Sequence, residues 1–127
     1  MNEKNVLAIL GSPHINGITA AMLNCAIHRV KKIGYNVTKI NLYEKKLSYC
    51  TGCRACINTG TCSLKDDIQE IAACLQKCQM VFLAAPVYWA NVPAPVKNLF
   101  DRLLGIAMEE TSTFPKPRLF ASSSNLG

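Results

Sequence analysis

Two short runs of uninterrupted apolar residues, 6–10 and 80–85, most strongly limit how this chain can fold. A strand that is apolar on both faces must be buried on both, which is typical of central strands in a parallel sheet. Each run is followed by a loop and then by a stretch with apolar residues three and four positions apart, which predicts an amphipathic helix. Three such stripes occur: Leu23, Ala26, Ile27, Val30 and Ile33; Ile68, Ile71, Ala72 and Leu75; and Val96, Leu99, Phe100, Leu103 and Leu104.

The segments between these runs complete an alternation of strands and helices. Residues 37–42 alternate, with Lys and Asn on one face, which predicts an edge strand. Gly34 is placed to end the first helix in a left-handed conformation, and Asp66 with Gln69 forms a capping-box pattern at the start of the second. With a further strand at 118–122, the order predicts an α/β fold in which helices cover both faces of a parallel sheet.

The length of 127 residues has room for one compact domain, and we expect residues 1–127 to form it. A five-stranded domain of this class needs another strand and helix after residue 122. We therefore expect a short sheet, a chain truncated after its fourth strand, or an edge that a partner chain covers.

Composition excludes several classes of protein. Half of the residues are apolar and 17% are charged, which is unlike a disordered chain. No apolar run approaches the roughly 18 residues of a membrane span, and the first apolar run is too short for a signal peptide. The net charge is +6, but the basic clusters are short, so we expect a solvated positive surface, or a field that gathers phosphorylated ligands, and no nucleic-acid or membrane partner. A soluble, cytoplasmic protein is predicted.

The loop at residues 11–19 lies between a buried strand and a helix, where backbone N–H groups and the positive end of a helix favour a phosphate. Ser12 and Thr19 add hydroxyl donors, Gly17 allows close approach of the backbone, and His14 is a further donor. The loop has neither the Walker pattern nor Gly-x-Gly-x-x-Gly, so a terminal monophosphate fits better than a dinucleotide pyrophosphate. The alternative is an ordinary Ser/Thr-capped turn.

The loop at residues 86–93 follows the second buried strand and brings Tyr88 and Trp89 to the same edge of the sheet. Two adjacent aromatic residues can flank a planar ring, and a loop stiffened by Pro93 can read the polar edge of that ring through its backbone. The alternative is that these aromatic residues pack the domain or an oligomer interface. Together the two loops indicate a site for a phosphate attached to a flat heterocycle, beyond the carboxyl ends of the strands.

Four of the seven cysteines fall within residues 50–62, which without a secretion signal indicates metal or redox chemistry rather than disulfides. Gly52 and Gly60 let this segment wrap around a group. The spacing is compatible with a [4Fe–4S] cluster, with tetrahedral zinc, or with structural or redox-labile thiols. The candidate ligands are Cys50, Cys53, Cys56 and Cys62, while Cys25, Cys74 and Cys78 are expected to be small core residues.

Three ordered motifs resemble the flavodoxin-like NAD(P)H-dependent FMN reductases, and within them the iron–sulfur flavoprotein branch. The motifs are GSPHINGIT, CTGCRACINTGTCSLKDD and APVYWANVPAPVKNLFDRL, and they span about residues 5–104. The resemblance implies a three-layer flavodoxin-like fold with bound FMN. The implied FMN contacts, the phosphate on 12–19 and the isoalloxazine against 86–91, are Ser12, His14, Asn16, Gly17, Ile18, Thr19, Pro86, Val87, Tyr88, Trp89 and Asn91.

The chain departs from the family pattern at His14, where Arg is usual, and at Ile18, where Asn is usual. Both changes remove polar contacts that the family makes near the phosphate, so a weaker affinity for FMN is expected.

The resemblance implies an oxidoreductase that passes electrons from NAD(P)H through bound FMN to a quinone, a free flavin or another acceptor. No Ser-His-Asp set or carboxylate pair is evident, so no side chain is assigned as catalytic and the flavin would supply the chemistry. The alternative is a non-enzymatic electron carrier in which FMN and a [4Fe–4S] cluster relay electrons between redox proteins. A third possibility is a truncated, inactive domain.

A homodimer or homotetramer is also expected. In the family, loops of this kind meet across a subunit interface, and Trp89 and residues 50–62 are predicted to lie near the contact.

Overall fold

The computed structural model describes residues 4–103, 106 and 118–124, and its centre is a four-stranded sheet. The strand order is β2-β1-β3-β4 and every neighbouring pair is parallel, so that Ile9 lies beside both Ile40 and Leu83. The second strand is at the edge, as its alternating pattern predicted. The strands are β1 (Asn5–Leu10), β2 (Asn36–Asn41), β3 (Met80–Pro86) and β4 (Arg118–Ser124).

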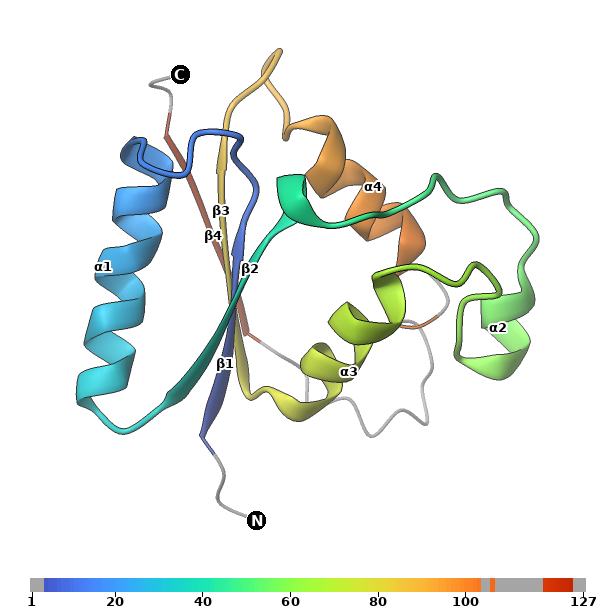
Figure 1. Cartoon of the computed structure of the whole chain (residues 1–127), viewed down its shortest axis with the longest axis horizontal. Coiled ribbons are helices and arrows are strands. Elements are labelled where there is room, and N and C mark those ends of the chain that lie inside the picture. The colour runs from blue at the N-terminus through green and yellow to red at the C-terminus, as the bar shows by residue number, and fades with distance from the viewer. Residues whose placement is uncertain (1–3, 104–105, 107–117, 125–127) are drawn as a thin grey trace.

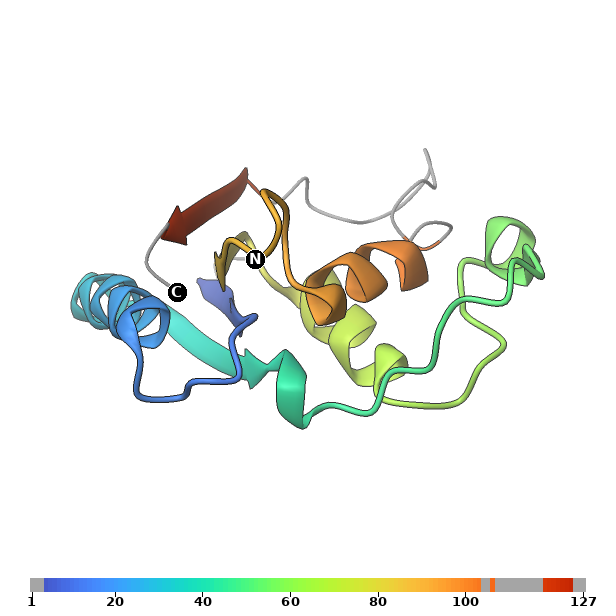
Figure 2. The ribbon, with the colours of Figure 1, turned by 90° about the horizontal axis from the view of Figure 1, so that it is seen from above.

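Helices cover both faces of the sheet and give three layers. Helix α1 (Ile18–Lys32) lies on one face, and α3 (Ile68–Lys77) and α4 (Ala94–Arg102) lie on the other (Figure 1). This arrangement confirms the predicted flavodoxin-like α/β/α class. The 3₁₀-helix η1 (Leu42–Glu44) follows β2, and the segment that carries the short α2 (Ala55–Thr59) extends outward beyond α3 and α4 (Figure 2).

The core explains why β1 contains no polar residue after its first position. Leu7 and Ile9 pack in the cluster beneath α3 and α4, whereas Ala8 and Leu10 pack beneath α1. Successive side chains of a strand point to opposite faces, so β1 contributes to both halves of the core. Full burial of one Leu or Ile side chain is worth about 1.5–3 kcal/mol. Among the described residues, no helix combines the length and apolar character that a membrane crossing needs.

Most residues of the predicted apolar stripes are buried or half-buried, but the predictions for the C-terminal ends of α1 and α4 are wrong. Gly34, with φ of 99°, ends α1, as predicted. Ile33 therefore falls at the cap rather than within the helix, and its side chain is exposed. On α4, Phe100 is partly exposed, and the buried face continues through Arg102 instead. Leu104 lies outside the described residues.

Gly11 fixes how closely α4 approaches the end of β1. Its N–H donates to the carbonyl of Ala84 at 2.7 Å, so pairing with β3 continues into the loop. A Cβ atom at this position would lie 2.5 Å from Cγ2 of Val96 and 3.2 Å from Cβ of Ala85. The absence of a side chain thus allows α4 to pack directly on the start of the 11–17 loop.

Candidate functional site

The loops that follow β1 and β3 meet at the carboxyl end of the sheet (Figure 1). The strand order reverses here, because the chain proceeds from β1 to β2 on one side and to β3 on the other; such switch points are where open α/β sheets bind ligands. The two loops together enclose a cavity of about 350 Å³. Its lining residues are Ser12, His14, Gly17, Ile18, Thr19, Pro86 and Tyr88.

The first wall of this cavity is the N-terminus of α1. Its N-cap residue is Gly17, which has no side chain that could cap the helix. The first turn also holds no acidic residue. The first turn of α1 thus brings backbone N–H groups and the positive end of the helix dipole to the cavity, which suits an anion.

Two buried hydroxyl groups lie beside this helix end. Ser12 is 2% exposed and Thr19 is 6% exposed. The Oγ atom of Ser12 accepts from the backbone N–H of His14 at 3.2 Å, which leaves its own hydroxyl hydrogen available as a donor. A Cβ at Gly17 would lie 3.1 Å from Cβ of His14, so the loop is tightly folded. These residues fit a phosphate group.

The other predicted flavin contacts lie outside the lining of this cavity. Asn16, Trp89 and Asn91 are exposed and Val87 is partly buried. The side chain of Asn91 accepts from the N–H of Val92 at 2.8 Å, so it supports its own loop. Their contact with FMN stays a prediction.

The tip of the 86–93 loop is a strained two-residue turn. Tyr88 and Asn91 exchange backbone hydrogen bonds of 2.8 and 3.0 Å, and Trp89 and Ala90 between them have φ angles of 52° and 59°. Turns with two left-handed residues favour Asn-Gly, because a Cβ atom is disfavoured in this region. The indole of Trp89 is 99% exposed, so nothing in the described part of the chain packs against it.

Replacing Ala90 by Gly should raise the free energy of unfolding by about 0.5–1 kcal/mol, because relief of left-handed strain exceeds the added chain entropy of Gly. Ala90→Val should lower it, because a β-branched residue tolerates the φ of 59° less well. Denaturant unfolding of both variants measures the difference. If Ala90→Gly is no more stable than the parent, the inference that the backbone of Ala90 is strained is wrong.

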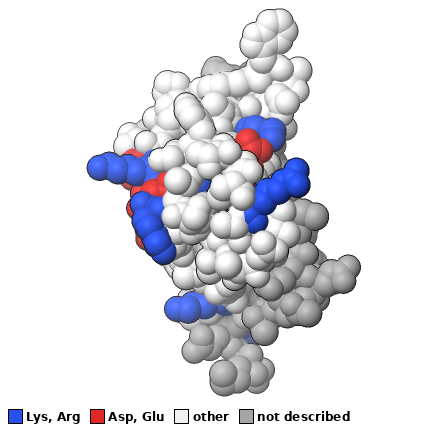
Figure 3. All heavy atoms as spheres, turned by 90° about the vertical axis from the view of Figure 1, so that its right-hand side faces the viewer, with Lys and Arg blue, Asp and Glu red and all other residues white. Residues whose placement is uncertain are grey.

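The four clustered cysteines line a second cavity, of about 380 Å³, on the outer side of α4. All seven cysteines of the chain are free thiols. Cys78 is buried and Cys74 half-buried, but the prediction that Cys25 is a core residue is wrong, because it lies on the exposed side of α1. The face that bears this segment is mainly uncharged, with Lys and Arg toward its margins (Figure 3). The cavity is lined by Cys50, Thr51, Gly52, Cys53, Arg54, Cys56, Ile57, Cys62, Ser63, Asp101 and Arg102.

Three of these four sulfur atoms have a hydrogen-bonding neighbour. The N–H of Gly52 donates to Sγ of Cys50 at 3.4 Å, and Nη2 of Arg102 donates to Sγ of Cys62 at 3.3 Å. Sγ of Cys53 lies 3.3 Å from the Ser63 hydroxyl, and this contact is the main cause that lowers the pKa of the thiol. Hydrogen bonds to sulfur favour thiolates and tune Fe–S clusters.

The four thiols of this cavity are candidate ligands for a metal ion or a cluster. Among the described residues, no three Cys, His or acidic side chains converge as ligands of a single metal ion would. A [4Fe–4S] cluster is bound at four separate iron atoms, so its thiolates stand further apart than the ligands of one zinc ion. Four thiols around one cavity supply the donor type that both groups use, and which of them the segment holds stays a prediction.

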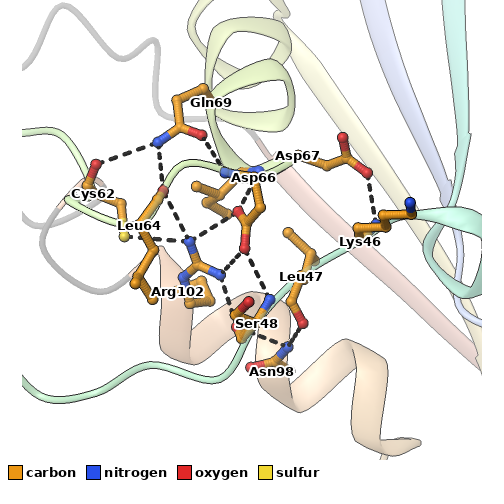
Figure 4. A network of polar contacts seen from close by, with 11 residues as sticks. Lys46, Leu47, Ser48, Cys62, Leu64, Asp66, Asp67, Gln69, Asn98 and Arg102 are labelled. Atoms are coloured by element: carbon orange, nitrogen blue, oxygen red, sulfur yellow. Dashed lines mark hydrogen bonds and ion pairs between the residues drawn. The ribbon is translucent and has the colours of Figure 1, made fainter.

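Arg102 is the functional candidate that the sequence analysis missed (Figure 4). Its side chain is fully buried, and its guanidinium pairs in a two-pronged contact with Asp66, through Nη1–Oδ2 at 2.7 Å and Nη2–Oδ1 at 3.0 Å. Nη1 also donates to the carbonyl of Ser48 at 2.7 Å, and Nη2 to that of Leu64 at 3.5 Å. A signal was present: Arg102 follows Leu99 at helical spacing, on the apolar face of α4.

Asp66 joins this pair to the start of α3. It forms the predicted capping box with Gln69, since its N–H donates to Oε1 of Gln69 at 3.1 Å and its Oδ1 accepts from the N–H of Ile68 at 3.1 Å. The hydrogen bonds from Arg102 are the largest cause that lowers the pKa of Asp66 to about 2.

This pKa predicts a loss of stability in acid. A carboxyl group whose folded pKa lies below its unfolded value of 3.8 stabilises the fold fully above about pH 4 and loses that contribution as the pH falls toward 2. For Asp66 the contribution is about 2 kcal/mol. The free energy of unfolding, measured from pH 7 to pH 2, should fall by this amount in the parent protein. In Asp66→Asn, which has no carboxyl group at this position, that part of the decrease should be absent. Parallel pH profiles for the two proteins would contradict the assignment.

Fold and cavity together define a flavodoxin-like α/β protein with a cavity beyond the ends of β1 and β3. The sequence profile of the family described as NADPH-dependent FMN reductase matches residues 4–126. The chain belongs to this family, which confirms the resemblance of its motifs.

Similar proteins with curated names point to one branch. An iron–sulfur flavoprotein of Archaeoglobus fulgidus is 39% identical over 98 residues, which cover 77% of this chain and 44% of that protein. An iron–sulfur flavoprotein of Methanocaldococcus jannaschii is 34% identical over 97 residues, which cover 76% of this chain and 50% of that protein. This chain thus spans about half the length of these relatives.

Solved structures bear out the fold. An NAD(P)H:quinone oxidoreductase from Methanothermobacter marburgensis superposes with a TM-score of 0.75 at 18% identity, over 96% of this chain and 66% of that one. A putative quinone reductase from Klebsiella pneumoniae gives a TM-score of 0.61 at 23% identity, over 80% of this chain and 45% of that one. At these identities the likeness establishes a shared flavodoxin-like architecture.

Proposed function

We propose that this protein is an FMN-dependent oxidoreductase that takes electrons from NAD(P)H and passes them to a quinone, a free flavin or another acceptor. The observation that carries the proposal is the cavity between the 11–19 and 86–93 loops, where the N-terminus of α1 meets two buried hydroxyl groups. Membership in the FMN reductase family supports it.

The residues of this chain would bind and orient the cofactor. Ser12, Thr19 and the first N–H groups of α1 would hold the phosphate, while Tyr88 would lie against the ring. The backbone hydrogen bonds between Tyr88 and Asn91 hold the loop in one conformation, so its polar groups can face the ring edge without reordering. Bound FMN would supply hydride acceptance and one- or two-electron transfer.

The test begins with FMN binding to the purified protein, followed by oxidation of NADH and NADPH with a quinone or free FMN as acceptor. Turnover that requires bound FMN supports the reductase. Failure to bind FMN would overturn the proposal, and bound FMN that neither NADH nor NADPH reduces would favour the electron carrier.

The second candidate is an iron–sulfur flavoprotein that carries electrons between redox partners with FMN and a [4Fe–4S] cluster. The four thiols that line one cavity, three of them with hydrogen-bonding neighbours, favour it. Under strictly anaerobic preparation, Cys53→Ser or Cys56→Ser should remove iron while FMN stays bound, with Cys25→Ser as the control. Less than one iron atom per chain in the parent protein would reject the cluster.

We also propose that the protein assembles as a homodimer or homotetramer. Large apolar side chains without cover support this: Trp89 is 99% exposed, Tyr49 81% and Ile57 56%. The mainly uncharged face over the cysteine segment agrees (Figure 3). Analytical ultracentrifugation should give a multiple of the chain mass, and Trp89→Lys should shift it toward the monomer. A monomer that retains FMN would contradict this assembly.

A further inference from the structure

The guanidinium of Arg102 closes the cysteine-bearing segment at its base. It contacts Ser48, where the segment leaves the layer of helices, and Leu64 and Asp66, where the segment returns to it (Figure 4). The same group donates to Sγ of Cys62 at 3.3 Å. One side chain of α4 thus joins both ends of a long loop to the last of its four cysteines.

Stability alone does not account for a buried charge at this place. Apolar residues of similar volume often replace a buried ion pair at no cost in stability, because the desolvation of two charges offsets their attraction. The Nε atom of Arg102 is also buried without a hydrogen-bond partner among the described residues, which is unfavourable. The arrangement is better explained by a positioning role. The planar guanidinium can donate to several acceptors in fixed directions and so hold both ends of the cysteine-bearing segment in place.

The position of Arg102 has an electrostatic consequence as well. A cation in contact with a sulfur atom of the cavity stabilises additional negative charge there. Reduction of an electron-accepting group bound by these thiols would add negative charge, so the guanidinium would raise the reduction potential of that group.

We propose that Arg102 is the positioning residue of the cysteine segment: it anchors the two ends of the segment to α4 and presents Cys62 to the cavity shared by the four thiols. Anchoring is a property of this chain with or without a cluster, whereas the effect on potential rests on the electron-carrier candidate proposed above. The two parts are therefore measured separately.

Trypsin cleavage after Arg54 measures the anchoring in metal-free protein. Arg54 is exposed and lies immediately before α2 with φ of 62°, so the segment must open before a protease can bind it in extended form. Cleavage tracks the population of the open form when opening is fast. The variants are Arg102→Lys, which keeps the charge without the fork, and Arg102→Gln, which removes both. Lys97→Gln is the matched control, because it removes one cation from the exposed face of the same helix.

Both Arg102 variants should be cleaved at Arg54 roughly ten times faster or more, since each loses hydrogen bonds worth about 1 kcal/mol apiece. Lys97→Gln should be cleaved at the parental rate. After anaerobic reconstitution with iron and sulfide, both Arg102 variants should hold less iron than the parent. The midpoint potential of the remaining cluster should fall in Arg102→Gln and change less in Arg102→Lys.

Far-UV circular dichroism and a cooperative denaturant unfolding transition show whether each variant is folded, independently of FMN or iron. If Arg102→Gln fails to fold, Arg102→Lys and Asp66→Asn decide the outcome. If the parent protein binds no iron, the electron-carrier candidate fails while faster cleavage of the variants still supports the anchoring role. Parental cleavage rates in folded Arg102→Lys and Asp66→Asn would overturn the role of Arg102.

Discussion

A single methyl group added at Gly11 is expected to destabilise the fold by about 1–3 kcal/mol, the usual cost of overpacking. The new Cβ would lie 2.5 Å from Cγ2 of Val96, a distance that requires one of the two elements to move. Val96 cannot turn aside easily, because its side chain is fully buried and β-branched residues have one preferred rotamer in helices. Helix α4 and the start of the 11–19 loop must therefore move apart.

A second substitution tests this explanation. Val96→Ala removes the atom that blocks the new Cβ, so Gly11→Ala should cost less in the Val96→Ala background than in the parent. A double-mutant cycle from denaturant unfolding measures this coupling, which we expect to be at least about 0.5 kcal/mol. Additive effects of the two substitutions would show that Gly11 is not required for the approach of α4.

The regular elements were predictable because their signals are local. The two apolar runs are central strands, the alternating run 37–42 is the edge strand in all but its last residue, and the 118–122 run is a strand. Gly34 and the Asp66–Gln69 pair mark helix ends through backbone conformation and capping, which depend on neighbouring residues alone.

The parts that escaped prediction depend on residues far apart in the chain. Arg102 contacts Asp66 and Cys62, which lie 36 and 40 positions earlier in the sequence, and no spacing rule connects them. The left-handed turn at Trp89 and Ala90 violates local preference, so a propensity argument points away from it. Sequence motifs could nominate four cysteines, but only the structure shows that all four line one cavity beside a buried cation.

Loss of the Ser12 and Thr19 hydroxyl groups is expected to weaken FMN binding more than any other change in the flavin cavity. A hydrogen bond to a charged group is worth about 1.5–3 kcal/mol, so Ser12→Ala and Thr19→Val should each reduce the affinity about tenfold or more. Both hydroxyls are nearly buried, so water cannot easily replace them. If the two effects are independent, the double variant should lose about a hundredfold.

Riboflavin provides the control, because it carries the same ring without the phosphate. Titration by flavin fluorescence should show that both variants bind riboflavin as the parent does, while their affinity for FMN falls. An equal loss for both ligands would mean that the loop had changed its fold, and Ser63→Ala, in the distant cysteine cavity, should leave both affinities unchanged. If both single variants bind FMN with the parental affinity, the prediction that the 11–19 loop binds the phosphate is wrong. The predicted contact between the flavin ring and the 86–93 loop would then lose its support, because the ring can reach this loop in a fixed orientation only if the phosphate is held at the end of α1.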